Sequence, residues 1–183
     1  MYLGIDHSVN GTAIALLSSP SNYTTYLIKG KGANSQEKLL YTAYSIRSIV
    51  HEQMLNIKKV AIEGGSFRSD GHLYTLGQVS GAIIYALKDL KIIQVPPKTL
   101  KKFISGNGDA EKPYVMKKIL EKYNIEFNDD NKADAYSLAL FCYRLDNKEG
   151  TPFREELESV IKFDQHIKYK KIKRTRIKKK INL

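Results

Sequence analysis

Four acidic residues stand where their carboxylates could act together. Asp6 and Glu63 each follow a short apolar run that is typical of a β-strand. Asp130 and Asp134 are four residues apart in a segment with helical periodicity, so they share one helix face. Converging carboxylates repel one another unless a cation neutralises them, and hard oxygen ligands select Mg²⁺ or Mn²⁺. With phosphate as a further ligand, such a cluster could catalyse two-metal hydrolysis.

Each acidic residue also has an ordinary interpretation. Asp6 could simply open a hairpin turn, and Glu63 could be a solvated strand end. Asp130 and Asp134 could be favourable charges at a helix N-terminus. The neutral Asn131 shares the face of Asp134. The joint occurrence at the ends of suitable elements favours the metal-site hypothesis.

The elements that must position these residues alternate along the chain. Strands are predicted at 2–5, 12–17, 23–29, 58–63 and 91–95, and helices at 36–55, from 73, and at 98–104, 111–123, 130–145 and 152–163. Short turns make strands one to three antiparallel, whereas intervening helices favour parallel pairing of the last two. This is an α/β layout similar to the RNase H-like five-stranded mixed sheet flanked by helices. In such a sheet, strands one and four are adjacent and parallel, so Asp6 and Glu63 emerge at one edge.

Composition limits the classes of protein and of partner. The 183 residues predict a domain at 1–150, a C-terminal helix at 151–163 and a basic tail at 164–183. The net charge is +11, and the tail holds nine Lys and Arg against one acid, Asp164. This favours a nucleic acid over an anionic membrane surface as partner, although the tail could be merely solubilising.

No apolar run is long enough for a membrane span, and no secretory signal is evident. The single Cys142 excludes a disulfide framework and a multi-cysteine zinc site, which fits a reducing compartment.

Several motifs, in order over about residues 2–145, resemble one family. They are Gly4-Ile-Asp6, Ala61-Ile-Glu63 with Phe67 nearby, Leu76-Gly-Gln-Val-Ser-Gly81, Pro97-Lys98 with Lys101 and Gly106, Ala110-Glu-Lys112, and Ala133-Asp134-Ala135. Together they resemble the RuvC family of Holliday-junction resolvases, and more its short phage-type branch.

The resemblance implies an endodeoxyribonuclease that resolves four-way junctions by paired symmetric nicks. It implies a homodimer, two Mg²⁺ per site with Mn²⁺ as a substitute, and a cytoplasmic location (the host cytoplasm if a bacteriophage encodes the protein). Asp6, Glu63 and Asp134 would be metal ligands, and Lys112 would act in catalysis. The family's fourth ligand position is Asn131 here, with Asp130 beside it; charge favours Asp130, and both stay candidates.

Predicted DNA contacts combine an aromatic wedge with basic side chains. They are Phe67, Arg68, Lys98, Lys101, Lys102, Lys112, Lys170, Lys171, Lys173, Arg174 and Arg176. Phe67 could equally be a core residue, and Lys101 and Lys112 could lie on a solvated helix face. The tail would add phosphate contacts without base readout.

The helix that begins near residue 73 is a candidate dimer surface. Its apolar stripe is Leu76, Val79, Ile83, Ile84 and Leu87, with Gly77 and Gly81 allowing close approach. The same stripe could be intramolecular core.

Three other functions remain open. A less selective nuclease for forks and flaps would have the same site. A non-catalytic junction-binding protein would keep the positive charge and lose the metals, against which the intact carboxylates argue. The pattern from Gly4 to Thr12 also resembles the first phosphate loop of actin-like kinases, which need two such lobes.

Overall fold

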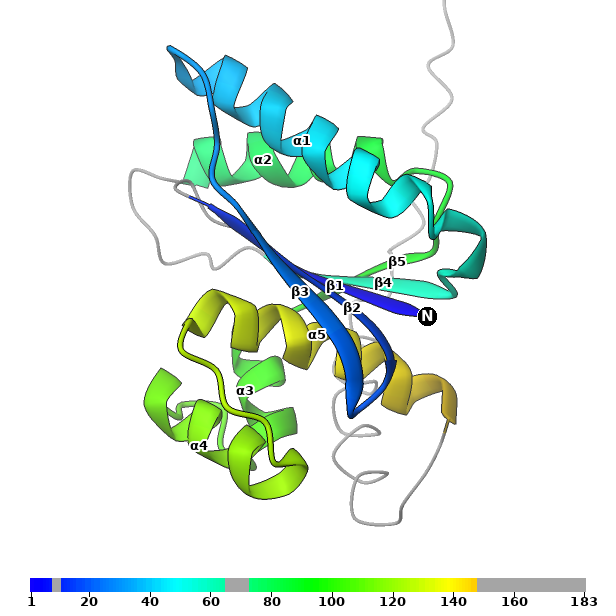
Figure 1. Ribbon diagram of the computed structural model, residues 1–183. Helices are drawn as coiled ribbons and strands as arrows, with labels where there is room; N and C mark the ends of the chain where they lie inside the picture. Colours follow the sequence, from blue (N-terminus) through cyan, green and yellow to red (C-terminus); the bar gives the residue numbers. More distant parts are fainter. Residues whose placement is uncertain (8–10, 65–72, 148–183) are drawn as a thin grey trace, which may run out of the picture.

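The computed structural model describes residues 1–7, 11–64 and 73–147 (Figure 1). The predicted C-terminal helix at 151–163 and the basic tail at 164–183 lie outside these ranges.

Strands and helices follow one another in nearly the predicted order. The strands are β1 (Tyr2–His7), β2 (Thr12–Ser19), β3 (Asn22–Ile28), β4 (Lys59–Glu63) and β5 (Ile92–Val95). The helices are α1 (Ser35–His51), the 3₁₀ turn η1 (Met54–Asn56), α2 (Leu73–Ala86), α3 (Pro97–Ser105), α4 (Lys112–Tyr123) and α5 (Asp130–Asn147).

The five strands form one mixed sheet in the order β3-β2-β1-β4-β5. β1 pairs antiparallel with β2, and β2 pairs antiparallel with β3. β4 runs parallel to both β1 and β5. The predicted RNase H-like sheet is therefore confirmed, with β1 at its centre.

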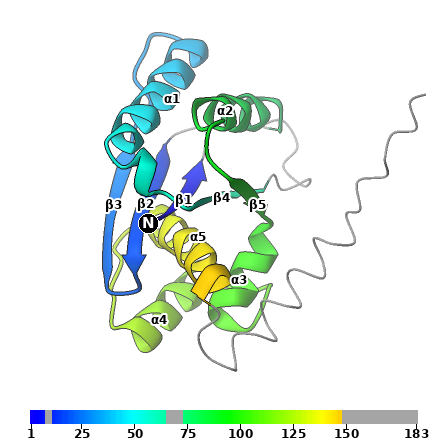
Figure 2. The same ribbon diagram turned by 90° about the vertical axis from the view of Figure 1, so that its right-hand side faces the viewer.

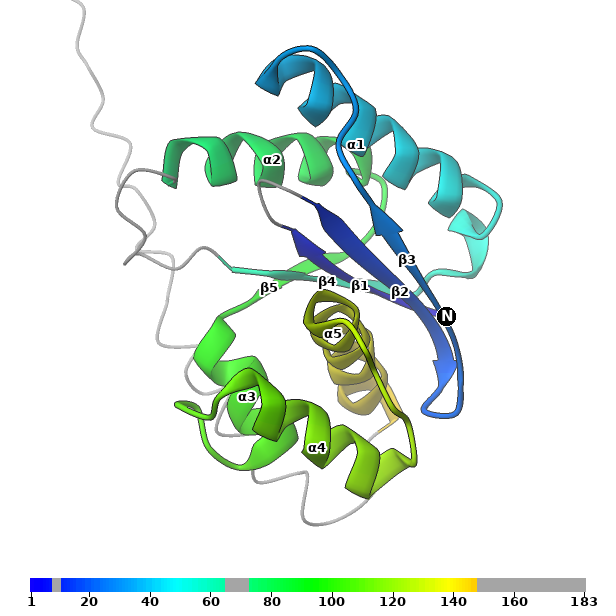
Figure 3. The same ribbon diagram turned by 60° about the vertical axis from the view of Figure 1, so that its left-hand side comes forward.

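Helices cover both faces of the sheet and make three layers (Figure 2). α1 and α2 lie on one face, and α5, with α3 and α4 beyond it, lies on the other (Figure 3). β1 alternates between the two apolar cores, since Leu3 and Ile5 belong to the α1–α2 side and Tyr2 belongs to the α5 side. Asp6 shares the α5 face with Tyr2.

Helix α1 is shorter than predicted. Asn34 caps it, because the Asn34 side chain accepts a hydrogen bond from the Glu37 amide at 2.9 Å. The helix ends at His51 instead of continuing to residue 55. Tighter bonds replace the helical ones there, with Gln53 N donating to Val50 O, and the chain turns through η1 into β4.

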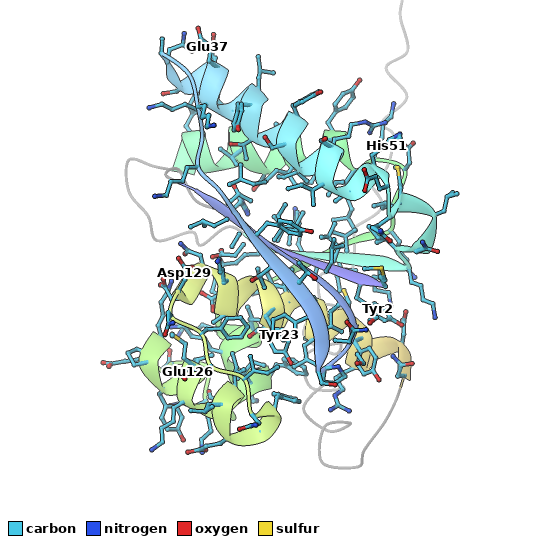
Figure 4. All side chains as sticks on the ribbon, in the orientation of Figure 1. Tyr2, Tyr23, Glu37, His51, Glu126 and Asp129 are labelled. Atoms are coloured by element: carbon cyan, nitrogen blue, oxygen red, sulfur yellow. The ribbon has the colours of Figure 1, made fainter. Side chains whose placement is uncertain are left out.

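Aromatic packing fixes the first half of α5 against the β2–β3 hairpin. The Tyr136 ring lies 5.0 Å from the Tyr23 ring and 5.4 Å from the Phe127 ring, between centroids. The Tyr136 hydroxyl donates a hydrogen bond to the Pro20 carbonyl at 2.9 Å. Figure 4 shows Tyr23 between β3 and the helices of this layer.

The far end of α5 is held by an ion pair between Lys59, which is 8% exposed, and Asp146. None of the helices in the described ranges is long and apolar enough to cross a membrane.

Candidate active site

The first two acidic residues lie side by side at one edge of the sheet. The parallel β1–β4 register pairs Gly4 with Ala61 and Ile5 with Ile62, so Asp6 and Glu63 are the next residues on adjacent strands. The two carboxyl groups share a hydrogen bond. The sequence-based expectation that both emerge at the same edge is confirmed.

Helix α5 brings Asp134 to the same edge. Asp129 caps this helix by accepting a hydrogen bond from the Lys132 amide at 2.9 Å, and Figure 4 shows Asp129 at the start of α5. Asp134 lies in the following turn, and its side chain is 18% exposed. The charge of Asp134 raises the pKa of Asp6, and the charge of Glu63 raises the pKa of Asp134. Three carboxyl groups from β1, β4 and α5 therefore lie close together.

The three carboxyl groups resist ionisation. Burial, then the charges of Glu63 and Asp134 and the hydrogen bond to Glu63, raise the pKa of Asp6 to about 8. Burial raises the pKa of Asp134 to about 6, although Lys112 opposes this. Burial also raises the pKa of Glu63, against the hydrogen bond from Asp6 and the charges of Lys112 and Lys101. Both carboxyl groups of the pair are therefore held in surroundings that disfavour their charged forms.

Lys112 supplies a positive charge at the rim of the cluster. Its Nζ lies 2.5 Å from Oδ2 of Asp130 and 3.5 Å from Oδ2 of Asp134. Burial alone would lower the pKa of Lys112, but the hydrogen bond to Asp130 and the charges of Asp134, Asp130 and Asp6 raise it. The lysine begins α4 and so joins α4 to α5 across the site.

The two candidates for a fourth ligand are both in the first turn of α5. The hydrogen bond from Lys112 lowers the pKa of Asp130, whose side chain is 45% exposed. Asn131 is partly buried. Asp130 influences the pKa of Asp134 but is not among the groups that shift the pKa of Asp6 or Glu63. Asp130 therefore lies at the exposed edge of the buried cluster. The choice between Asp130 and Asn131 as the fourth ligand stays open.

A hard divalent cation fits the chemistry of this cluster. Within the described ranges, no three Asp, Glu, His or Cys side chains are arranged to hold a metal ion as they stand. Instead, Asp6 and Glu63 are linked by a hydrogen bond, and the ammonium of Lys112 lies beside Asp134. The donors are all carboxylate oxygens. Burial, and then their mutual repulsion, raise the pKa of Asp6, and a divalent cation would relieve that repulsion.

The predicted DNA-contacting lysines lie on α3 beside the site. Lys101 is close enough to lower the pKa of Glu63. Lys98 and Lys102 are exposed, and Lys98 pairs with Asp109. The other predicted contacts are outside the described residues: Phe67, Arg68, Lys170, Lys171, Lys173, Arg174 and Arg176.

The apolar stripe of α2 is mainly core. Val79, Ile83 and Leu87 are buried against the sheet, so these three residues of the stripe are intramolecular core, whereas Ile84 is partly buried. Gly77 and Gly81 lie on the exposed face, and no heavy atom would lie within 4 Å of a Cβ added at either.

Two contacts near the site were not predicted. One is the Lys112 pairing with Asp130 and Asp134. The other links Ser80 of α2 to Nε2 of His7, the residue after Asp6. These partners are 18 and 73 residues apart along the chain, and no periodicity in the sequence indicates them.

Residues 2–142 match the family described as crossover junction endodeoxyribonuclease RuvC. The chain belongs to this family. It is 28% identical over 148 residues to the RuvC protein of Rickettsia bellii (strain RML369-C), which covers 76% of this chain and 94% of that protein. It is 24% identical over 147 residues to RuvC of Synechococcus sp. (strain WH7803), covering 75% and 94%. The phage-type assignment stays a prediction.

Solved structures of the family share the fold. Thermus thermophilus RuvC in complex with a Holliday junction substrate superposes with a TM-score of 0.62 at 18% identity, covering 76% of this chain and 92% of that one. A second T. thermophilus RuvC structure gives a TM-score of 0.61 at 17% identity, covering 78% and 93%.

Proposed function

We propose that this protein is an endodeoxyribonuclease that resolves four-way DNA junctions by paired symmetric nicks in the cytoplasm. The family match over residues 2–142 supports the reaction. The convergence of Asp6, Glu63 and Asp134 at one sheet edge carries the assignment of the site.

Asp6, Glu63 and Asp134 would hold divalent metal, with Mg²⁺ as the physiological ion and Mn²⁺ as a substitute. Either Asp130 or Asn131 would complete the site. The family is one of divalent-metal nucleases. A metal pair held by these residues would supply activation of a water and charge stabilisation of the leaving 3′-oxygen. Metal binding would require the carboxyl groups of Asp6 and Glu63 to be ionised.

Basic residues of α3 and α4 would hold the DNA strand at the site. Lys112 sits at the edge of the carboxylate cluster, and Lys101 lies near Glu63 on the neighbouring helix. Their ammonium groups would contact the phosphates that flank the scissile bond, positioning the backbone without reading bases. Exposed Lys98 and Lys102 on α3 would extend this contact.

Two copies of the chain would cut the two opposed strands. The exposed face of α2 is the surface we assign to the dimer. It carries Tyr74 and Tyr85, which are 79% and 73% exposed, with Gly77 and Gly81 between them. Glycines on an exposed helix face let a second backbone approach closely.

A cleavage assay on a synthetic four-way junction tests this function. Wild-type protein should cut two opposed strands with Mg²⁺ and neither in EDTA, and Asp6→Asn should bind the junction without cutting. Absence of cleavage by the wild type would favour a junction-binding protein. Equal cleavage of forks and flaps would instead favour a less selective nuclease. Asp130→Asn and Asn131→Ala in the same assay identify the fourth ligand.

A further inference from the structure

Gly4, two residues before Asp6 on the same strand, lies in direct contact with the backbone of α5. A Cβ added at Gly4 would lie 2.0 Å from the carbonyl oxygen of Ala135 and 2.4 Å from the amide nitrogen of Ala139. It would also lie 3.0 Å from Cβ of Leu138. Because two of the three obstructing atoms are helix backbone, no side-chain rotation can make room.

Small residues continue this contact across the sheet. The register places Ala15 on one side of Gly4 and Ala61 on the other, and both are fully buried in the core beneath α5. α5 therefore rests on a row of residues with little or no side chain. Asp6 and Glu63 are the next residues on the same face of β1 and β4, directly beside this row.

The contact is adjacent to the cluster on both elements. Asp134 directly precedes Ala135, whose carbonyl touches the position of the missing Cβ. On β1, Asp6 is the next residue that faces α5. The spacing between helix and strand at Gly4 therefore sets the spacing between the carboxylates of Asp134 and Asp6.

We propose that Gly4 is a positioning residue for the metal site. Its lack of a side chain seats α5 against β1 so that Asp134 joins Asp6 and Glu63. This inference rests on the proposed function, because it takes those three residues as metal ligands.

The expected displacement is large for a metal site. Real Cβ atoms essentially never approach another heavy atom closer than 3.0 Å, whereas the closest contact here would be 2.0 Å. To remove this overlap, α5 would have to move outward by about 1 Å at this point. Functional constellations must be held to within about 0.5 Å. A substitution at Gly4 should therefore weaken metal binding as well as the fold.

The test measures Mn²⁺ binding by the full chain without DNA, at a temperature where each variant is folded. Gly4→Ala should weaken Mn²⁺ affinity by about tenfold or more, the size of effect seen for residues that orient metal ligands. Leu3→Ala is the matched control, because Leu3 adjoins Gly4 but packs into the opposite core. It should lower stability and keep Mn²⁺ affinity within about twofold, because α5 stays seated.

Junction binding in EDTA provides a second measurement, and it should be unchanged in Gly4→Ala. If Gly4→Ala does not fold, Ala15→Val adds bulk at the neighbouring position of the same row, away from the Gly4 contact, and should weaken Mn²⁺ binding in part. Mn²⁺ affinity equal to that of the wild type in whichever of these variants folds would overturn the positioning role. Asp6→Asn separates the two hypotheses: if it too binds Mn²⁺ normally, the ligand assignment itself fails.

Discussion

Asp6 keeps its proton well above the pH at which an exposed aspartate loses it. Burial removes the carboxylate from water, and Glu63 and Asp134 repel the charged form, so the pKa of Asp6 rises to about 8. Metal binding has to displace this proton, and also the one that Asp134 holds with a pKa of about 6. Metal affinity should therefore increase as the pH rises from about 6 to 8.

Without metal, the ionisation of Asp6 opposes folding. An acid whose pKa is raised on folding contributes most stability below its unfolded pKa of 3.8 and loses it as pH rises towards 8. The free energy of unfolding of Asp6→Asn should therefore exceed that of the wild type by about 1 to 3 kcal/mol at pH 8. At pH 4 the two proteins should be equally stable. Urea unfolding in EDTA at both pH values measures this difference.

Glu126→Gln is the control for that measurement, since Glu126 is exposed on the loop between α4 and α5. It should leave the pH dependence unchanged. Equal stability of Asp6→Asn and wild type at pH 8 would mean that the carboxylate cluster is not strained in the metal-free protein.

Lys112 has two opposing effects on the site. Its ammonium neutralises Asp130 and Asp134 and so competes with a metal ion for them. Lys112→Met should bind Mn²⁺ about three- to tenfold more tightly, a modest gain because the lysine is half exposed, yet cleave junctions more slowly. Titration calorimetry and single-turnover cleavage separate the effects. Lys117→Met, on the exposed side of the same helix, should change neither; weaker Mn²⁺ binding by Lys112→Met would contradict the competition.

At the scale of elements, α2 divides its two faces between core and surface. Val79 and Ile83 pack on the sheet, whereas the outward face carries Tyr74, Gly77, Gly81 and Tyr85; these six residues define the two sides of the helix. The hydrogen bond from Arg47 Nη1 to the Ala86 carbonyl, at 2.6 Å, ties α2 to α1. This hydrogen bond fixes the C-terminal end of α2 against α1, beside the face that we propose for the dimer.

Gly81→Glu should prevent dimer formation, because it places a charge on the exposed face without a steric conflict in the monomer. Sedimentation velocity should show monomers, and paired cuts on one junction should give way to single nicks. Ser48→Glu, an exposed change on α1, should leave the dimer intact. A dimeric Gly81→Glu protein would place the interface elsewhere.

The elements and their order were predictable because each depends on local patterns. Alternating and helical periodicity located the strands and helices, and the short connections predicted the antiparallel pairs. The end of α1 was predicted wrongly, because the helix ends at His51 and Leu55 is fully exposed in η1. Convergence of Asp6 with Glu63 followed from parallel pairing. The close contact of Gly4 with Ala135 and Ala139 was not predictable, because it depends on how closely β1 and α5, which are far apart in the sequence, approach each other.

At the scale of the whole molecule, positive charge is concentrated at the C-terminal end of the chain. Residues 164–183 hold nine of the 30 Lys and Arg and only one of the 19 acidic residues. Such a segment would bind phosphates at any sequence, whereas the proposed metal site would act at one bond. Affinity for DNA and the position of the cut should therefore be separable.

Deleting residues 164–183 should weaken junction binding and flatten its salt dependence, while the cleaved bonds stay the same. Each phosphate contact that is lost should reduce the slope of log K against log salt by about 0.9. Gel-shift titrations at several salt concentrations give the slope, and primer extension locates the cuts. An unchanged slope would show that the tail does not contact DNA.

The central position of β1 in the sheet implies that the two sides of the carboxylate cluster, on β1 and on α5, differ in their local stability. β1 is hydrogen-bonded along both edges, to β2 and to β4, so the Ile5 amide should exchange with deuterium only when the whole domain unfolds. Asn131 lies in the first turn of α5, where helices fray. Its amide should exchange far sooner in native-state measurements. If the proposed site is correct, its side at Asp130 and Asn131 should open more readily than its side at Asp6.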